Sequence, residues 1–340
     1  MVPKGFRRKM IIVLMIVTPG IPEYMTGSTM LDPLLYSIPV FIANLLIDLA
    51  LYPTGALLIR EFSIRFNKGW GSILTLGLDY GIMEEGISAH TFFMSPVPPV
   101  GILGEYGRFM GVNWIWALGI TVFHAIFSIC LPLFLVSIAY PKYSREPLLG
   151  RRGVKFVLFI YLLDVVMVNL SVMNTPYRPM PTLAEYLFFT ALTLILIYIA
   201  YLIPANSLSG KGDLPQGTGR FFLLGMIVFP LYLFNAVFPA SPNGVERISP
   251  VLEALIFIMA NLLVMIAITH YMPPSENRKH KFSLALGMIT PFFFWAEFLQ
   301  FTGGSLLITL VVIVALVMLN RLRKLVNSED ETTEQQQIPG

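Results

Sequence analysis

Long apolar runs, separated by short polar or Pro- and Gly-rich segments, recur along the whole chain. About 20 consecutive apolar residues are enough for a helix to cross the hydrocarbon core of a bilayer. The pattern predicts ten such helices in one all-α membrane domain over residues 1–320, followed by a charged, Gln-rich tail over residues 321–340 that we expect to be disordered. The predicted spans begin with a weak one from Met10, which Pro19, Gly20, Pro22 and Glu23 interrupt, and continue with 34–58, 71–92, 113–140, 156–173, 183–203, 221–238, 250–269, 282–300 and 305–320.

The composition supports a membrane protein. Of the 340 residues, 56% are hydrophobic and only 13% are charged, a balance that no soluble domain needs. The single cysteine, Cys130, excludes a disulfide within the chain, and the sequence indicates no thiolate metal site. The formal net charge of +3 is small, so we expect the lipid bilayer, and not a nucleic acid, as a partner.

The basic residues are distributed unevenly between the two sides of the predicted membrane. With the amino terminus in the cytoplasm, only three of the 23 Lys and Arg residues, Arg108, Arg178 and Arg247, fall in outer loops. Cytoplasmic loops of membrane proteins carry an excess of Lys and Arg. We therefore expect a multi-pass protein of the cell membrane with both termini cytoplasmic. No small-residue cleavage site follows the first span, so we expect it to be retained.

Two adjacent acidic residues, Glu84 and Glu85, lie inside the span predicted over 71–92. One charge at the centre of a membrane helix costs at least roughly 2.5–3.5 kcal/mol on insertion scales, so the pair needs partners, a proton or a function. At about 100° per residue the pair shares a stripe with Gly77, Gly81 and Ser88. Small residues let helices approach closely, so we expect this stripe to face the bundle. The alternative is a protonated, hydrogen-bonded pair with a purely structural role.

Further polar residues reach a similar depth in neighbouring spans. With a rise of about 1.5 Å per residue, Glu84 and Glu85 lie roughly 12 Å below the outer end of their span, and His124 lies roughly 15 Å below the same face. We predict that these three residues form one cluster in the outer half of the membrane, which is either a functional site or a structural one. The polar residues expected to line the site for a substrate are Asn44, Asp48, Asp164 and Ser128.

The pair Glu84-Glu85 in one span, with His124 in the next, resembles the superfamily of CAAX-processing and bacteriocin-processing intramembrane proteases and their PrsW-like relatives. These families show Glu-Glu-x-x-x-Arg on one helix, Phe-x-x-x-His on another, and a further His followed by Asn or Asp four residues later. The resemblance covers mainly residues 71–140. Ala89 stands at the arginine position and Ile120 at the phenylalanine position, and a second histidine at matching depth is missing.

The resemblance implies an intramembrane endopeptidase that acts on a membrane-bound peptide or protein. Glu84 or Glu85 would activate a water, and His124 would hold the water, a metal or the oxyanion. A catalytic zinc normally takes three protein ligands, which Glu84, Glu85 and His124 could supply. The alternative is a transport or binding protein whose carboxylate layer takes a proton, a cation or an amine. The missing arginine and second histidine favour transport, whereas the adjacent glutamates and the lack of broken repeats favour the peptidase.

Overall fold

The computed structural model describes residues 2–29, 31–96, 101–173, 175, 177–212, 217–237, 247–272, 277–302 and 307–336. Within these ranges the chain is almost entirely helical, which confirms the predicted all-α class. Two short strands, β1 (Arg108–Phe109) and β2 (Val112–Asn113), form an antiparallel hairpin that pairs Arg108 with Asn113 and Phe109 with Val112. Residues 238, 305, 306 and 337–340 of the predicted spans and tail lie outside the described residues.

The helices start where the sequence offers caps and continue through the apolar runs. Thr182 and Glu185 form a capping box at the start of α8, and the side chain of Asn277 accepts bonds from the first backbone N–H groups of α11. The α-helices are α1 (Lys4–Pro19), α2 (Pro33–Tyr36), α3 (Ile38–Arg65), α4 (Trp70–Ile82), α5 (Trp114–Phe123), α6 (Leu131–Ala139), α7 (Arg151–Val172), α8 (Leu183–Leu202), α9 (Thr218–Val237), α10 (Pro250–Tyr271), α11 (Arg278–Phe301) and α12 (Ile308–Gln336).

Three π-helical segments continue these helices without a break. The segment η1 (Gly20–Tyr24) continues α1, η2 (Met83–Ser88) continues α4, and η5 (His124–Cys130) joins α5 to α6. The span predicted over 71–92 is therefore one helical stretch over residues 70–88, and the span predicted over 113–140 is one stretch over residues 114–139.

Seven helices in the described part of the chain are long and apolar enough to cross a membrane. They are Ile38–Arg65, Trp114–Ala139, Arg151–Val172, Leu183–Leu202, Thr218–Asn235, Pro250–Tyr271 and Arg278–Phe301. The other predicted spans correspond to α1 with η1, α4 with η2, and α12. Taken alone, α1 has 16 residues and α4 has 13, and α12 joins an apolar half to a charged half. The count of ten spans stays a prediction.

The predicted tail begins within α12, which is helical as far as Gln336, and the disorder of the tail stays a prediction. Leu322 and Val326, one turn apart on α12, are buried in the main apolar core. Arg278 also donates a hydrogen bond to the Leu325 carbonyl at 3.3 Å. These contacts hold the first turns beyond Arg321 against the bundle, and the polar composition of the tail concealed them.

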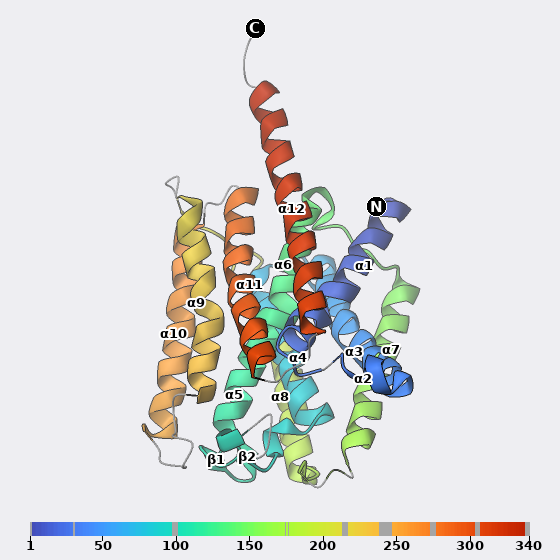
Figure 1. Ribbon diagram of the computed structural model, residues 1–340, viewed down its shortest axis with the longest axis vertical. Coiled ribbons are helices and arrows are strands. Elements are labelled where there is room, and N and C mark those ends of the chain that lie inside the picture. The colour runs from blue at the N-terminus through green and yellow to red at the C-terminus, as the bar shows by residue number, and fades with distance from the viewer. Residues whose placement is uncertain are drawn as a thin grey trace.

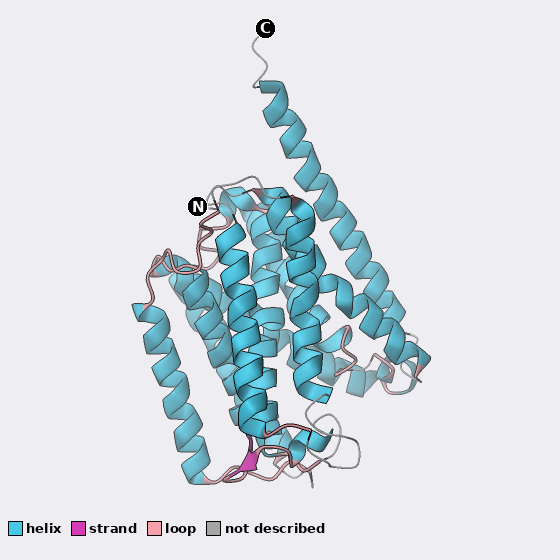
Figure 2. Cartoon of the chain, turned by 90° about the vertical axis from the view of Figure 1, so that its left-hand side faces the viewer, coloured by secondary structure: helices cyan, strands magenta, loops and turns pink. Residues whose placement is uncertain are grey.

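The elements form a bundle whose two ends differ. Figure 1 shows that α1 begins and α12 ends at one end of the bundle, while β1 and β2 lie at the opposite end. Figure 2 shows that α12 extends beyond the other helices. Large apolar side chains such as Met167 of α7, Leu187 of α8 and Leu263 of α10 are more than half exposed, as expected of helices that face lipid.

The predicted stripe of small residues on α4 does face the bundle. A Cβ atom added at Gly77 would lie 2.8 Å from the Cα of Ala125, and one at Gly81 would lie 3.0 Å from the Cα of Thr121. Glycine is therefore needed for the backbones of α4 and the α5–η5 stretch to approach this closely. This approach places α4 beside η5 and η2 beside α5, so that the acidic pair reaches His124, the first residue of η5.

Candidate functional site

Acidic residues and one histidine lie in the three π-helical segments. Glu23 belongs to η1, Glu84 and Glu85 belong to η2, and His124 is the first residue of η5. A π-helical turn is rare and occurs frequently at functional sites inside α-helices. Because it holds more residues per turn than an α-helix, neighbouring side chains on it are separated by a smaller angle. In η2 this favours two adjacent carboxylates reaching the same partner.

The imidazole of His124 lies between the two glutamates. Its Nε2 is 2.9 Å from Oε1 of Glu85, and its Nδ1 is 3.1 Å from Oε2 of Glu84. The Nδ1 atom is also 2.9 Å from the hydroxyl of Ser128. All four side chains are buried. The structure thus brings together four of the residues that the sequence placed in the site.

A tyrosine links this group to a third glutamate. The hydroxyl of Tyr52, on α3, contacts Oε1 of Glu84 and Oε1 of Glu23. A phenol has one proton and can donate it to only one of the two carboxyl groups, so the other must itself carry a proton and donate it to the phenol oxygen. The second oxygen of Glu23 accepts a hydrogen bond from Thr29 at 2.7 Å. Glu23, Tyr52 and Glu84 therefore share protons along a continuous chain.

A threonine and a tryptophan hold the carboxylate of Glu85 in place. The hydroxyl of Thr91 donates to Oε2 of Glu85, and the indole Nε1 of Trp116 donates to that hydroxyl at 3.0 Å. Both oxygens of Glu85 are thus engaged, one by His124 and one by Thr91. Glu84 differs, because its Oε2 makes no contact with hydrogen-bond geometry in the described part of the chain, although His124 is near.

The remaining predicted site residues lie beside the cluster and not within it. Asp48 is buried and accepts a hydrogen bond from the hydroxyl of Tyr24, the neighbour of Glu23, at 2.7 Å. Asp164 on α7 is buried, and its Oδ2 has no hydrogen-bond partner among the described residues. Asn44 is only half-buried. A substrate that contacts these residues would approach the cluster along α3 and α7.

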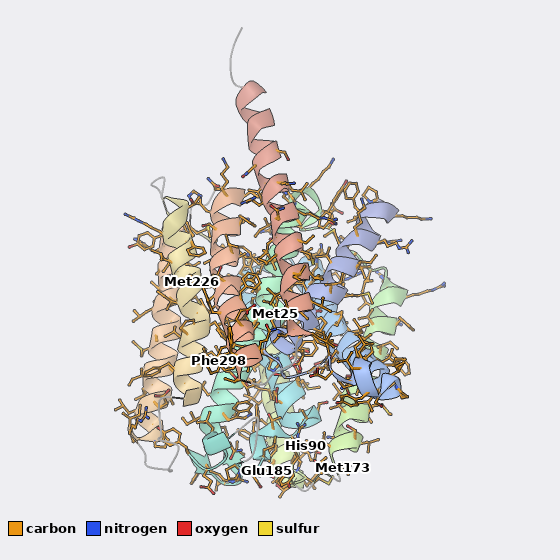
Figure 3. The ribbon with its side chains drawn as sticks, in the orientation of Figure 1. Met25, His90, Met173, Glu185, Met226 and Phe298 are labelled. Carbon is orange, nitrogen blue, oxygen red and sulfur yellow. The ribbon has the colours of Figure 1, made fainter. Side chains whose placement is uncertain are left out.

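His90 belongs to a separate polar group nearer the hairpin end of the bundle. It is fully buried, and its Nε2 lies 2.8 Å from the hydroxyl of Tyr186 and 2.9 Å from the amide nitrogen of Asn169. Figure 3 shows His90 at the end of the molecule where Glu185 and Met173 lie. These contacts give His90 partners of its own, apart from the Glu84–His124–Glu85 group.

Four residues belong to the cluster although the sequence did not predict them there: Glu23, Tyr52, Thr91 and Trp116. The position of Glu23, a charged residue next to the first apolar run, could have indicated a buried acid. Because Glu23 follows Pro19 and Gly20, however, the sequence indicated only the end of a span. Tyr52 lies one turn after Asp48 on α3, and an aromatic residue in an apolar run is read as core. Its hydroxyl partners become visible only in three dimensions.

Glu84, Glu85 and His124 also form a group of possible metal ligands. One ligand atom from each residue lies within 4.8 Å of the others, and two carboxylates with one imidazole are donors that zinc accepts. In the present arrangement, however, both imidazole nitrogens face carboxylate oxygens, at 2.9 and 3.1 Å. Neither nitrogen lone pair is directed at a free position, so the donor types fit a metal but the arrangement is that of a hydrogen-bonded acid–base cluster.

Comparison of the chain with models of protein families, with curated proteins and with solved structures gave no match. The resemblance to intramembrane proteases therefore rests on Glu84, Glu85 and His124, and it stays a prediction.

Proposed function

We propose that the protein is an intramembrane peptidase whose reactive group is the Glu84–His124–Glu85 cluster. The observation that carries this proposal is the contact of one buried imidazole with both glutamates, at 3.1 and 2.9 Å. Buried acid–base groups with perturbing neighbours are typical of catalytic sites, and intramembrane ionisable residues are functional by default. The expected substrate is a peptide segment within or at the surface of the bilayer.

The arrangement suggests different roles for the two glutamates. Glu84 has the less engaged carboxyl oxygen, so we assign it as the general base that takes a proton from the attacking water. The water oxygen then bonds to the peptide carbonyl carbon. His124 stays bound to Glu85 through Nε2, and the oxyanion displaces Ser128 as the partner of its Nδ1–H. Glu84 returns its proton to the leaving amine as the C–N bond breaks. Tyr52 holds Glu84 in place through its other oxygen.

The proposal is tested by incubating the purified protein with membrane-segment peptides and identifying products by mass spectrometry. We expect cleavage that continues after treatment with a zinc chelator, because the imidazole nitrogens are already hydrogen-bonded. Metal analysis of the same preparation provides the control. If about one zinc is found per chain and the chelator stops cleavage, a metallopeptidase replaces the metal-free mechanism. Absence of cleavage for every peptide contradicts the peptidase proposal.

One observation favours a second function, the transport of protons or cations. Hydrogen bonds join Glu23 to Tyr52, Tyr52 to Glu84 and His124 to Glu85, and Nδ1 of His124 lies 3.1 Å from Glu84, so a chain of polar groups crosses four helical stretches. Such chains occur in proton relays. Under this alternative, vesicles containing the protein show proton or cation flux while no peptide is cleaved. The two measurements on one preparation separate the two classes.

We also propose that ten spans cross the cell membrane, with both termini in the cytoplasm. The common end of α1 and α12 and the exposed apolar faces support this arrangement. In a variant with Cys130→Ala, single cysteines placed beside Arg178 or Arg247 are expected to react with an impermeant thiol reagent added from outside. Cysteines placed beside Lys211 or Arg278 should react only after the membrane is opened. The reverse labelling pattern contradicts the proposed orientation.

A further inference from the structure

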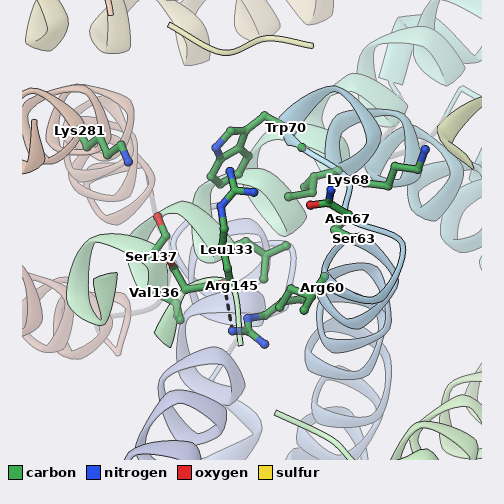
Figure 4. Close-up of a pocket in the computed structure, with 14 residues that line it drawn as sticks. Arg60, Ser63, Asn67, Lys68, Trp70, Leu133, Val136, Ser137, Arg145 and Lys281 are labelled. Atoms are coloured by element: carbon green, nitrogen blue, oxygen red, sulfur yellow. Dashed lines mark hydrogen bonds between the residues drawn. The ribbon is translucent and has the colours of Figure 1, made fainter. Parts of the chain in front are cut away.

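A second polar site lies far along the bundle from the carboxylate cluster. Where α3 ends and α4 begins, a cavity of about 140 Å³ opens between these helices, α6, the loop that follows it and the first turn of α11 (Figure 4). Among the described residues that line it, four are basic, namely Arg60, Lys68, Arg145 and Lys281, and none is acidic. Arg278 ties the start of α11 to the end of α6, because its Nε donates to the Ile138 carbonyl at 2.7 Å. The cavity walls are therefore fixed to one another.

Arg60 is a buried cation at the bottom of this cavity, only 6% exposed. Its Nη2 donates to the carbonyls of Tyr143, Ser144 and Glu146 at 2.9–3.2 Å, whereas its Nη1 has no hydrogen-bond partner in the described part of the chain. Glu61 lies 3.6 Å from Nη1.

The carboxylate of Glu61 is shared between Arg60 and several other donors. It also binds Arg65 at 3.0 Å and accepts the backbone N–H groups of Leu148 and Leu149. Part of the positive charge of Arg60 is therefore left uncompensated beside the cavity. A buried donor without an acceptor is costly, which favours an anion that would accept from it.

The start of α4 adds a second anion-binding element. Gly69 is the N-cap of this helix, no side chain caps it, and Gly69 and Trp70 both line the cavity. The first N–H groups of a helix and its dipole attract anions, phosphate groups above all. The glycine also allows close packing, because an added Cβ would lie 2.0 Å from the Ala205 carbonyl oxygen.

We propose that this cavity binds the phosphate group of an anionic ester. Arg145 and Lys281 would supply charge-assisted hydrogen bonds to phosphate oxygens, whereas the ammonium group of Lys68 already donates to the Ile203 carbonyl at 3.2 Å. Ile73, Leu133 and Val136 give the cavity an apolar wall for the ester carbon atoms. The volume suits a headgroup-sized ligand and is below the roughly 300–1,000 Å³ of sites for drug-sized molecules. Basic pockets between membrane helices bind lipid headgroups, and a soluble phosphate ester offers the same chemistry.

Native mass spectrometry and thermal melting of the full-length protein in detergent test this proposal. The probes are phosphatidylglycerol, phosphatidylcholine and glycerol 3-phosphate. We expect the phosphatidylglycerol affinity of the double variant Arg145→Gln/Lys281→Gln to be at least about tenfold weaker than that of the wild type, because two charge-assisted contacts are lost. The matched control is Arg151→Gln/Arg152→Gln, two exposed cations of α7 that do not line the cavity.

The outcomes distinguish the source of the phosphate. Binding of phosphatidylglycerol alone identifies an anionic lipid, whereas binding of glycerol 3-phosphate as well identifies a site for the phosphate ester itself. Retention of phosphatidylcholine equal to that of phosphatidylglycerol, equal loss in the two double variants, or binding of none of the probes overturns the proposal. If the first double variant does not fold, the single change Arg145→Gln at an exposed residue gives the same comparison. None of these results depends on peptide cleavage.

Discussion

Replacing Glu84 by Gln, Glu85 by Gln or His124 by Ala is expected to lower the rate of peptide cleavage by about 10²–10⁴-fold, the usual cost of losing a general acid or base. Glutamine keeps the size of glutamate and most of its hydrogen bonding, so the two glutamine variants should remain folded and monodisperse in detergent. Tyr52→Phe should cause a smaller loss, because it removes a group that positions Glu84 and takes no part in bond breaking. Cleavage rates at saturating peptide measure all four effects.

The control for these changes is Asp79→Asn, which makes the same acid-to-amide change on α4 away from the His124 contacts. Its cleavage rate should stay close to that of the wild type. If Glu84→Gln, Glu85→Gln and His124→Ala all keep full cleavage activity and full ion flux, neither the peptidase nor the transport function uses this cluster. Loss of ion binding in these variants, with no cleavage by the wild type, would identify the transport class.

Replacing Gly77 by Val is expected to destabilise the bundle more than any change to an exposed residue. The new Cβ would lie 2.8 Å from the Cα of Ala125 and 3.0 Å from its carbonyl oxygen, and backbone atoms cannot rotate away as a side chain can. Overpacking of this kind costs about 1–3 kcal/mol or more in the free energy of unfolding. A fall in Tm of about 2–4 °C in detergent would be consistent with this cost in a chain of this length.

The matched control is Gly219→Val, because Gly219 also lies in a helix but no atom comes within 4 Å of its added Cβ. Its Tm should change little. A Gly77→Val protein that melts like the wild type would show that α4 and η5 can move apart without loss. The predicted role of the glycine stripe in placing Glu84 and Glu85 beside His124 would then be wrong.

The helical class, the glycine contacts and the meeting of Glu84, Glu85 and His124 follow from simple rules. The period of the helix places Gly77, Gly81 and the glutamates on one face, and the rise per residue gives His124 the same depth. Both rules use distances along a single helix. They apply well here because α4–η2 and α5–η5–α6 are long and nearly continuous.

The contacts that depend on chain breaks or on other helices could not be predicted in this way. Glu23 reaches Tyr52 because α1 continues past Pro19 as a π-helical segment, where the sequence indicates an interruption. Val326 is buried although it lies in a segment of polar composition, because α12 packs along the bundle. In both cases tertiary packing overrides the local signal.

The make-up of the carboxylate cluster also sets the order in which it can be assembled during synthesis. In the proposed topology, Glu23, Glu84 and Glu85 enter the membrane in the first and third segments, before the ribosome has made the segment that carries His124. Each uncompensated charge would add a few kcal/mol to insertion, so these acids must enter as neutral carboxylic acids or wait at the water interface. The arrival of His124 supplies the only base in contact with the acidic pair among the described residues. The fourth segment therefore completes the cluster, and the protons that the nascent acids carried are then redistributed through Tyr52 and the imidazole.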